Sequence, residues 1–379
     1  MIALSLPNIA GNEWTYVKDC LDTGWISSVG AYVTKFEQMV ADFSDTKYGI
    51  AAANGTSALH MALEVAGVEQ NDVVLLPNIT FIASANAIKY TGADIVLIDV
   101  DPNTWQMDLD LLSEFLEKDT YYKKGKTYLR STNQCVKAIM PVHVLGNMCD
   151  MERLMRIANQ HCLLVIEDST EALGSTFNGK SAGSFGTFGT FSFNGNKIIS
   201  TGGGGVIVTN DEVLAKKAKH LTTQAKADAF EYIHDEIGYN YRLVNLLAAV
   251  GVAQMELLPG FLERKKVIDA RYRAELEGIA DIQFQVYSEG VVANNWLHTM
   301  KTSRQKDLIK HLIDNKIQCR PFWVPMNQLR MFKHEKYVSK HDHSDTVYQS
   351  CLSIPSSTGL TDEDQTTVIK TIADFYKTR

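Results

Sequence analysis

Short apolar runs alternate with segments of helical periodicity through the first two thirds of the chain. Four runs are apolar on both faces, at residues 73–77, 94–100, 137–143 and 163–168. Such runs are typical of strands in a buried, largely parallel sheet. Between them, apolar residues recur at helical intervals over residues 57–67, 108–118 and 151–160. The alternation predicts an α/β fold whose helices cover a doubly wound sheet.

A second, smaller domain is expected after this sheet. Residues 238–266 have the composition of a long helix that leaves the first domain, and Pro259 predicts a break or kink in it. We therefore place a large domain at residues 1–245 and a smaller α/β domain at residues 246–379. The most polar run, residues 116–134, is expected to form a solvated loop or hairpin.

Composition and charge indicate the class of the protein, its partners and its location in the cell. Of the 379 residues, 45% are hydrophobic and 21% are charged, as in ordinary globular proteins. A net charge of −7 disfavours a nucleic-acid partner. The N-terminus lacks the basic and apolar regions of a secretion signal, and we expect no segment long and apolar enough to cross a bilayer. These features predict a cytoplasmic protein with no membrane partner.

The cysteines give no sign of cross-linking. They show no C-x-x-C spacing, and their positions are Cys20, Cys135, Cys149, Cys162, Cys319 and Cys351. Cys162 opens a run predicted to be a core strand, which favours buried thiols in a reducing compartment. We expect neither disulfides nor a metal site.

The candidate chemistry begins at Lys197, which lies between two short apolar runs and just before the glycines at 202–205. A lysine in an apolar pocket can lose its proton near neutral pH, because burial disfavours the ammonium. The free amine then forms a Schiff base with a carbonyl group. From spacing alone, a surface lysine in a loop is the commoner interpretation.

Asp168 favours the catalytic interpretation of Lys197 over the surface interpretation. It ends the apolar run 163–168, and ligands bind at the carboxyl ends of strands in an open α/β sheet. Pyridoxal 5'-phosphate (PLP) needs a lysine for its aldehyde and an acidic partner that keeps its ring nitrogen protonated. Lys197 and Asp168 would supply both groups, so the pair predicts a PLP enzyme.

A phosphate site is one of two interpretations of the segment that begins at Asn54. Gly55, Thr56 and Ser57 fall where a predicted strand turns into a helix. The N–H groups and hydroxyls at a helix start attract phosphate, yet Thr and Ser also cap helices that bind no anion. Phe81 follows an apolar strand, and from its residue type alone it is expected to pack in the core.

Seven motifs follow one another along nearly the whole chain. They are GWISSVGAYVTKFE from Gly24, NGTSALHMAL from Asn54, TFIASANA from Thr80, PVHVLGN from Pro141, IEDSTEALGS from Ile166, FSFNGNK from Phe191 and GYNYRLVN from Gly238. The series resembles the sugar aminotransferases of the DegT/DnrJ/EryC1/StrS family, which are PLP enzymes of fold type I. FSFNGNK and GYNYR are most similar to the branch that aminates the 4-keto group of nucleotide-linked 6-deoxyhexoses. That branch includes enzymes for UDP-linked N-acetylated sugars on routes to bacillosamine or legionaminic acid.

The resemblance implies roles for the candidate residues. Lys197 and Asp168 would be catalytic. The other implied cofactor-binding residues are Gly55, Thr56, Ser57 and Ser192 at the phosphate, Phe81 against the ring, Glu171 beside it, and Asn240 from a neighbouring subunit. From residue type alone, Glu171 would be a helix-start carboxylate.

A shared active site is also implied. In the homodimers of this family, the segment that matches GYNYR reaches toward the cofactor phosphate of the neighbouring subunit. Asn240 would therefore contact the partner's cofactor, and Arg242 its substrate. Without the resemblance, both would be read as turn and surface residues.

Substrate contacts are implied at two further places. Trp25 and Ser27 match a segment that borders the sugar-nucleotide pocket, and Arg320 and Trp323 match a small-domain loop near the same cleft. Each tryptophan could instead be part of a domain-interface core. No catalytic role is assigned to His143 or His298, because a lone histidine is more often structural.

Two positions bear on the branch and on the reaction. Gly203 stands where many family members have a glutamate after the lysine, and this is compatible with the UDP-N-acetylhexosamine branch. Family dehydratases carry a histidine at the position of Lys197, so the lysine favours transamination.

The expected reaction has two halves. An amino acid, taken to be L-glutamate, passes its amino group to the cofactor, and a UDP-linked 4-keto sugar then takes that group up for surface glycan biosynthesis. Lys197 carries the proton in both directions. The alternatives are amination of a 3-keto sugar, use of a GDP- or dTDP-linked sugar, and a non-catalytic sensor that binds the cofactor or a sugar nucleotide.

Overall fold

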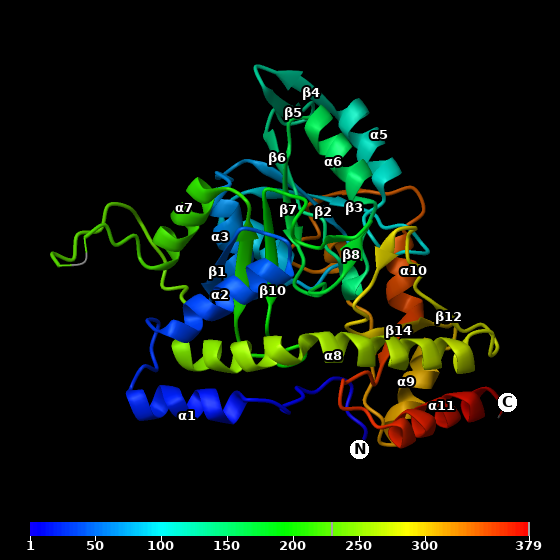
Figure 1. The fold of residues 1–379 in the computed structure, drawn as a ribbon. Helices are drawn as coiled ribbons and strands as arrows, with labels where there is room; N and C mark the ends of the chain where they lie inside the picture. The colour runs from blue at the N-terminus through cyan, green and yellow to red at the C-terminus, as the bar shows by residue number, and fades with distance from the viewer. Residues whose placement is uncertain (229, 378–379) are drawn as a thin grey trace.

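A mostly parallel sheet forms the centre of the computed structural model, which describes residues 1–228 and 230–377 (Figure 1). In spatial order its strands are β1 (Tyr48–Ala52), β11 (Gly205–Thr209), β10 (Phe188–Ser192), β7 (Leu164–Asp168), β6 (Cys135–Ile139), β2 (Val73–Pro77), β3 (Asp94–Ile98) and β16 (Lys336–Val338). In this row β11 runs antiparallel to both neighbours, and the remaining pairs are parallel. The predicted buried, parallel sheet is confirmed.

Both faces of the sheet are buried, as the apolar runs predict. In β2, Val74 and Leu76 join the core on one face, while Val73 and Leu75 join the core on the other. The first face is covered by α3 (Gly55–Val65), α4 (Ala83–Tyr90) and α7 (Glu212–Thr222), and the second by α5 (Leu109–Asp119) and α6 (Met151–Gln160). A third core lies between the sheet, α2 (Ala31–Phe43) and α8 (Asn245–Leu276).

The C-terminal part forms a smaller antiparallel sheet with its own core. Its strand order is β12 (Gln283–Phe284), β14 (His298–Lys301), β17 (Cys351–Ile354) and β15 (Arg320–Pro321). This sheet packs with the C-terminal half of α8, α9 (Gln305–Asp314) and α11 (Asp362–Lys377). The expected large domain with a smaller C-terminal α/β unit is confirmed. The division at residues 245 and 246 stays a prediction, and β16 crosses it by pairing with β3.

The remaining elements are short or peripheral. Helix α1 (Glu13–Thr23) lies below α8 in Figure 1, and α10 (His343–Ser350) precedes β17. A three-stranded sheet is formed by β13 (Val291–Val292), β8 (Thr176–Phe177) and β9 (Lys180–Ser181), and two 3-10 turns span Val144–Gly146 and Met326–Gln328. The polar run 116–134 forms a hairpin of β4 (Thr120–Lys123) and β5 (Lys126–Leu129), the second of its two predicted forms.

Helix α8 differs from two expectations. It continues through Pro259, so the predicted break is absent. Its 32 residues are also long and apolar enough to cross a membrane by length and composition, contrary to our expectation for the chain. However, 56% of its most apolar window is buried inside the protein, where it packs against α1 and α2. It is a core helix, and the cytoplasmic location stays a prediction.

Cys162 is exposed rather than buried, contrary to the expectation. It adopts a φ of 54° in the turn between α6 and β7, so the strand begins two residues later, at Leu164. Four of the other cysteines are buried, and Cys135 is half-buried.

Candidate active site

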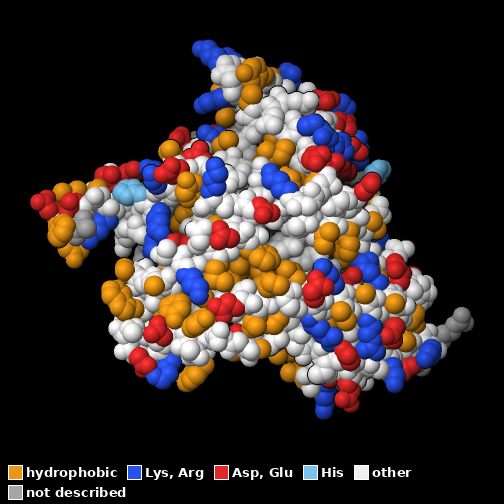
Figure 2. All heavy atoms as spheres, viewed as in Figure 1, with side chains coloured by type: hydrophobic (Ala, Val, Ile, Leu, Met, Phe, Trp, Pro, Cys, Tyr) orange, Lys and Arg blue, Asp and Glu red, His pale blue; other side chains and the backbone are white. Residues whose placement is uncertain are grey.

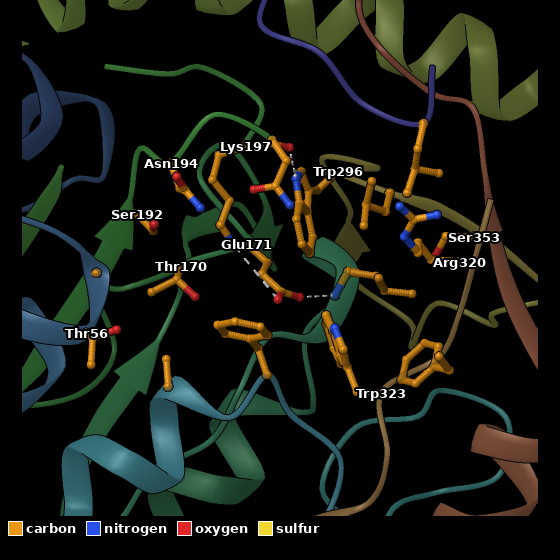
Figure 3. Close-up of a pocket in the computed structure, with 18 of the residues that line it drawn as sticks. Thr56, Thr170, Glu171, Ser192, Asn194, Lys197, Trp296, Arg320, Trp323 and Ser353 are labelled. Atoms are coloured by element: carbon orange, nitrogen blue, oxygen red, sulfur yellow. Dashed lines mark hydrogen bonds and ion pairs between the residues drawn. The ribbon is translucent and has the colours of Figure 1, made fainter. Parts of the chain in front are cut away.

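Lys197 lies in a cavity of about 360 Å³ at the carboxyl ends of β7 and β10, with small-domain residues along one side (Figure 3). The loop that carries it joins β10 to β11, the two strands that flank it in the sequence. The cavity also brings together several other predicted residues, namely Gly55, Thr56, Phe81, Glu171, Ser192, Arg320 and Trp323. The interpretation of Lys197 as a surface lysine in a loop is therefore wrong.

One end of the cavity is the N-terminus of α3. Asn54 is the N-cap, and its side chain accepts a hydrogen bond from the backbone N–H of Ser57 at 2.8 Å. Ser57 is buried and does not line the cavity. Gly55 and Thr56 do line it, beside Ser192. The first N–H groups of a helix have no partner within the helix, and its dipole favours an anion there.

The space at this end depends on the absence of a side chain at Gly55. A Cβ atom at residue 55 would lie 2.8 Å from Cβ of Ser192 and 3.3 Å from Cγ2 of Thr170. Without it, backbone N–H groups and the hydroxyls of Thr56, Thr170 and Ser192 surround a space suited to a phosphate group. Thr170 was not predicted.

Asp168 ends β7 directly behind the cavity and is only 2% exposed. Its Oδ2 accepts a hydrogen bond from the Ser84 hydroxyl at 2.6 Å, and its Oδ1 accepts one from the Thr170 N–H at 3.1 Å. These two donors orient the carboxylate. Ser84 comes from α4, and nothing in the sequence near Asp168 indicates this contact.

Lys197 and Glu171 form a close pair, with side chains that are 12% and 2% exposed. Nζ of Lys197 lies 3.8 Å from Oε1 of Glu171, and Oε2 accepts the Leu145 N–H at 2.8 Å. Leu145 has a φ of 61°, a conformation that costs a non-glycine residue about 1 kcal/mol or more. Its backbone is therefore held in an unfavourable conformation while it binds Glu171.

Burial changes the ionisation of both members of this pair. It lowers the pKa of Lys197, an effect opposed by the negative charges of Glu171 and Asp168. It raises the pKa of Glu171 to about 7, with Lys197 acting in the opposite direction. A lysine with a lowered pKa is better suited than an exposed one to attack a carbonyl and to move protons.

Aromatic rings bound the middle of the cavity. Phe81 is 55% exposed and lines the cavity, so the core-packing interpretation is wrong. The Trp296 ring lies under Lys197, with Nζ 4.0 Å from the ring centroid. Trp296 was not predicted, because it lies far from Lys197 in the sequence.

The other end of the cavity belongs to the small domain. Arg320 and Trp323 line it, together with Ser353, and lie on the far side of Lys197 from Thr56 and Ser192 in Figure 3. The Arg320 guanidinium donates to the backbone carbonyl of Cys319 at 2.9 Å, and no described carboxylate forms an ion pair with it. This end is therefore positively charged and partly aromatic.

Four predicted residues lie away from this cavity in a single chain. Trp25 and Arg242 line a second hollow of about 540 Å³ beside α1 and α2. Ser27 is exposed near them, and its carbonyl accepts the Asn245 N–H at 2.6 Å. Asn240 is exposed on the segment between α7 and α8.

Both histidines are buried in polar networks outside the cavity lining. Nε2 of His143 lies 3.0 Å from Glu167, whose carboxylate also accepts three backbone N–H groups. Nδ1 of His298 lies 3.0 Å from Asp269. Neither arrangement places an imidazole against Lys197.

Comparison with known proteins now identifies the family. The model of the DegT/DnrJ/EryC1/StrS aminotransferase family matches residues 7–373. The chain belongs to this family. It is 38% identical over 373 residues to the GDP-perosamine synthase of Escherichia coli O157:H7, covering 98% of this chain and 97% of that protein. It is 37% identical over 381 residues to the GDP-perosamine synthase of Caulobacter vibrioides, covering 97% and 96%.

The fold agrees with this membership. The crystal structure of a DegT DnrJ EryC1 StrS aminotransferase from Brucella abortus matches with a TM-score of 0.89 at 25% identity, covering 96% of this chain and 95% of that chain. The chain is a PLP-dependent sugar aminotransferase of fold type I. The cavity fits PLP, because it combines a lysine whose side chain is 12% exposed, a buried carboxylate behind it and the helix start at Gly55.

Proposed function

We propose that this aminotransferase moves an amino group from L-glutamate to the 4-keto carbon of a GDP-linked sugar. The observation that supports the reaction is the close Lys197–Glu171 pair, which lines the cavity between the helix start at Gly55 and the end that carries Arg320. The assignment of GDP as the nucleotide is supported by the two relatives named GDP-perosamine synthase. They favour this alternative over the UDP-linked N-acetylated sugar that the motifs predicted.

The cofactor's position follows from the residues at each side. Gly55, Thr56 and Ser192 would hold the phosphate, with Ser57 supporting the helix start from behind. Phe81 would cover one face of the ring, and Asp168 would keep the ring nitrogen protonated. When bound, PLP supplies an electron sink for the bonds at the carbon that carries the amino group.

Lys197 is the group that moves the proton. Its lowered pKa favours the neutral amine, the form that can take the proton from the α-carbon of the amino acid. In the second half, the same Nζ returns a proton at C4 of the sugar. Glu171, 3.8 Å away, stabilises the ammonium between these steps when its carboxyl group is charged.

The small-domain end would receive the substrate. Arg320 has no described carboxylate partner, so its guanidinium is free to bind a diphosphate or a carboxylate. Trp323 offers an aromatic face to a sugar or base. Both substrates would enter here in turn, since the helix start at the opposite end would hold the cofactor phosphate.

A second copy of the chain would complete each site. Tyr239 and Tyr241 stack on each other and meet the His60 ring of their own chain edge-on, which leaves the alternate residues Asn240 and Arg242 outside this cluster. The segment around them extends away from the body of the molecule (Figure 1).

That extended segment carries exposed apolar side chains. They are Phe230, Tyr232, Ile233 and Ile237, and Figure 2 shows hydrophobic side chains gathered along the projection. Apolar groups on such a projection favour burial against another surface. A homodimer would bury them, bring Asn240 to the partner's cofactor phosphate, and place Trp25, Ser27 and Arg242 at the partner's substrate cleft.

A substrate panel tests the proposal. Enzyme loaded with PLP should lose its visible cofactor band when L-glutamate is added, and the band should return with a GDP-linked 4-keto-6-deoxy sugar. Lys197→Ala, run in parallel, should show neither change. Return of the band with only the UDP-linked or only a 3-keto sugar would contradict the substrate assignment, and no response to glutamate would contradict the donor.

A further inference from the structure

Trp296 is held against Lys197 by contacts on several sides. Its ring centroid lies 4.0 Å from Nζ of Lys197, and its indole N–H donates to the carbonyl of Asn196 at 2.7 Å. Asn196 immediately precedes Lys197, so the indole contacts both the lysine side chain and the backbone that carries it. Figure 3 shows the ring standing beside Lys197 and above Trp323.

The backbone of Trp296 is fixed from the large domain. Its N–H donates to Oδ1 of Asn294 at 2.9 Å, and the Asn294 amide donates to the carbonyls of Glu171 and Leu173, both at 2.9 Å. Asn295, between them, has a φ of 55°, which turns the chain into the cavity wall. The segment that carries Glu171 and the segment that carries Trp296 are therefore tied together through one buried amide.

A buried lysine, Lys265, binds the backbone carbonyl of Trp296. Nζ of Lys265, in α8, donates to the carbonyl of Trp296 at 2.6 Å and to the carbonyl of Ser356. Lys265 is only 2% exposed, and among the described residues no carboxylate pairs with it. Burial lowers the pKa of Lys265 to about 7. Buried N–H groups need hydrogen-bond acceptors, and the two carbonyls supply them.

We propose that Trp296, held by Lys265 and Asn294, is a positioning residue that keeps the amine of Lys197 beside Glu171 whenever that amine is not bonded to the cofactor. The inference rests on the proposed role of Lys197. An indole face attracts an ammonium, and the attraction is strongest where water is excluded. Without the ring, a long flexible side chain would sample the cavity.

The ring should also bias the protonation of Lys197. The charged groups that face this amine are the carboxylates of Glu171 and Asp168, with Arg320 at the far end of the same cavity. Removing the indole removes one of the few interactions that favour the ammonium. The amine should then be neutral at lower pH than in the wild-type protein.

Reconstitution of the apoenzyme with PLP measures the pH at which Lys197 loses its proton. Apoenzyme is mixed with PLP over a range of pH, and the rate at which lysine-bound cofactor absorbance appears reports the neutral fraction of Lys197. For Trp296→Leu we expect the midpoint to fall by about one pH unit and the plateau rate to fall about tenfold. Trp296→Phe, which keeps an aromatic face, should show a smaller change in both.

Two lysines on the same helix provide a matched comparison. Lys265→Met should shift the midpoint in the same direction as Trp296→Leu, because the Trp296 backbone loses its tether. Lys266→Met should match the wild type, since Lys266 is exposed and pairs only with Glu263 among the described residues. Thermal melts of each apoenzyme identify a variant that fails to fold, and the milder Trp296→Phe then decides.

The outcomes separate the two proposals. If folded Trp296→Leu has the midpoint and plateau of the wild type, Trp296 does not position Lys197. If the wild type forms no lysine-bound cofactor, or Lys197→Ala forms it equally well, the proposed function fails instead.

Discussion

The amine of Lys197 lies 3.8 Å from Oε1 of Glu171, and the two side chains, 12% and 2% exposed, both line the cavity. Each therefore has an altered affinity for protons. Burial has the largest effect on both pKa values: it raises the pKa of Glu171 and lowers the pKa of Lys197.

The first prediction concerns Glu171→Gln and the pH dependence of stability. The pKa of Glu171 is raised to about 7 in the folded protein. Its contribution to the stability of the fold is therefore favourable at low pH, and it is lost as the pH rises from the pKa of the unfolded chain to about 7. Glutamine does not titrate and can still accept the Leu145 N–H. The apo variant should therefore gain stability over the wild type, by about 3 kcal/mol at most, between pH 4 and pH 8.

Urea unfolding of both apoenzymes at the two pH values checks this. A difference in free energy of unfolding that stays constant from pH 4 to pH 8 would show that Glu171 is not the titrating group.

The second prediction concerns Gly55→Ala. The new methyl group would lie 2.8 Å from Cβ of Ser192, and residues 55 and 192 both line the space proposed for the phosphate. Overpacking of this kind costs about 1–3 kcal/mol, so PLP should bind about ten- to a hundredfold more weakly. Gly203→Ala is the matched control, because a Cβ there meets no atom within 4 Å. Equal PLP dissociation constants for the two variants, measured by fluorescence titration, would contradict the phosphate assignment.

The third prediction concerns Ser84→Ala. The Ser84 hydroxyl donates to Asp168 at 2.6 Å, and hydrogen bonds to charged groups contribute about 1.5–3 kcal/mol. Without it, the carboxylate loses one of its two described donors and is less well oriented toward the ring nitrogen. The variant should unfold at lower denaturant concentration and release PLP faster on dialysis. Release at the wild-type rate by a destabilised variant would assign Ser84 a purely structural role.

The sheet and most helices were predictable because their signals are local. The strands β2, β3, β6 and β7 and the helices α3, α5 and α6 follow directly from apolar runs and helical periodicity. The course of α8 was less predictable. Pro259 is exposed on the helix surface, and packing on either side sustains the helix through it.

The candidate site was predictable only where a motif marked it. Asp168 stands at the end of a strand, Gly55 at the start of a helix and Lys197 in the loop that follows β10, and each lies in a distinctive sequence pattern. Ser84 and Trp296 reach the same place from distant segments through tertiary packing. No spacing rule connects them to Lys197, so only the folded structure shows their contacts.

The last prediction tests the shared site by mixing two inactive variants. Lys197→Ala lacks the reactive amine, and Asn240→Ala lacks the proposed contact to the partner's phosphate, so each homodimer should be nearly inactive. In a mixed dimer, one site would receive Lys197 from one chain and Asn240 from the other, and would be intact. Refolding the two variants together in equal amounts should therefore restore about a quarter of the wild-type sites. Activity that stays at the sum of the separate variants would show that each chain builds its site alone, and a monomer in ultracentrifugation with full activity would lead to the same conclusion.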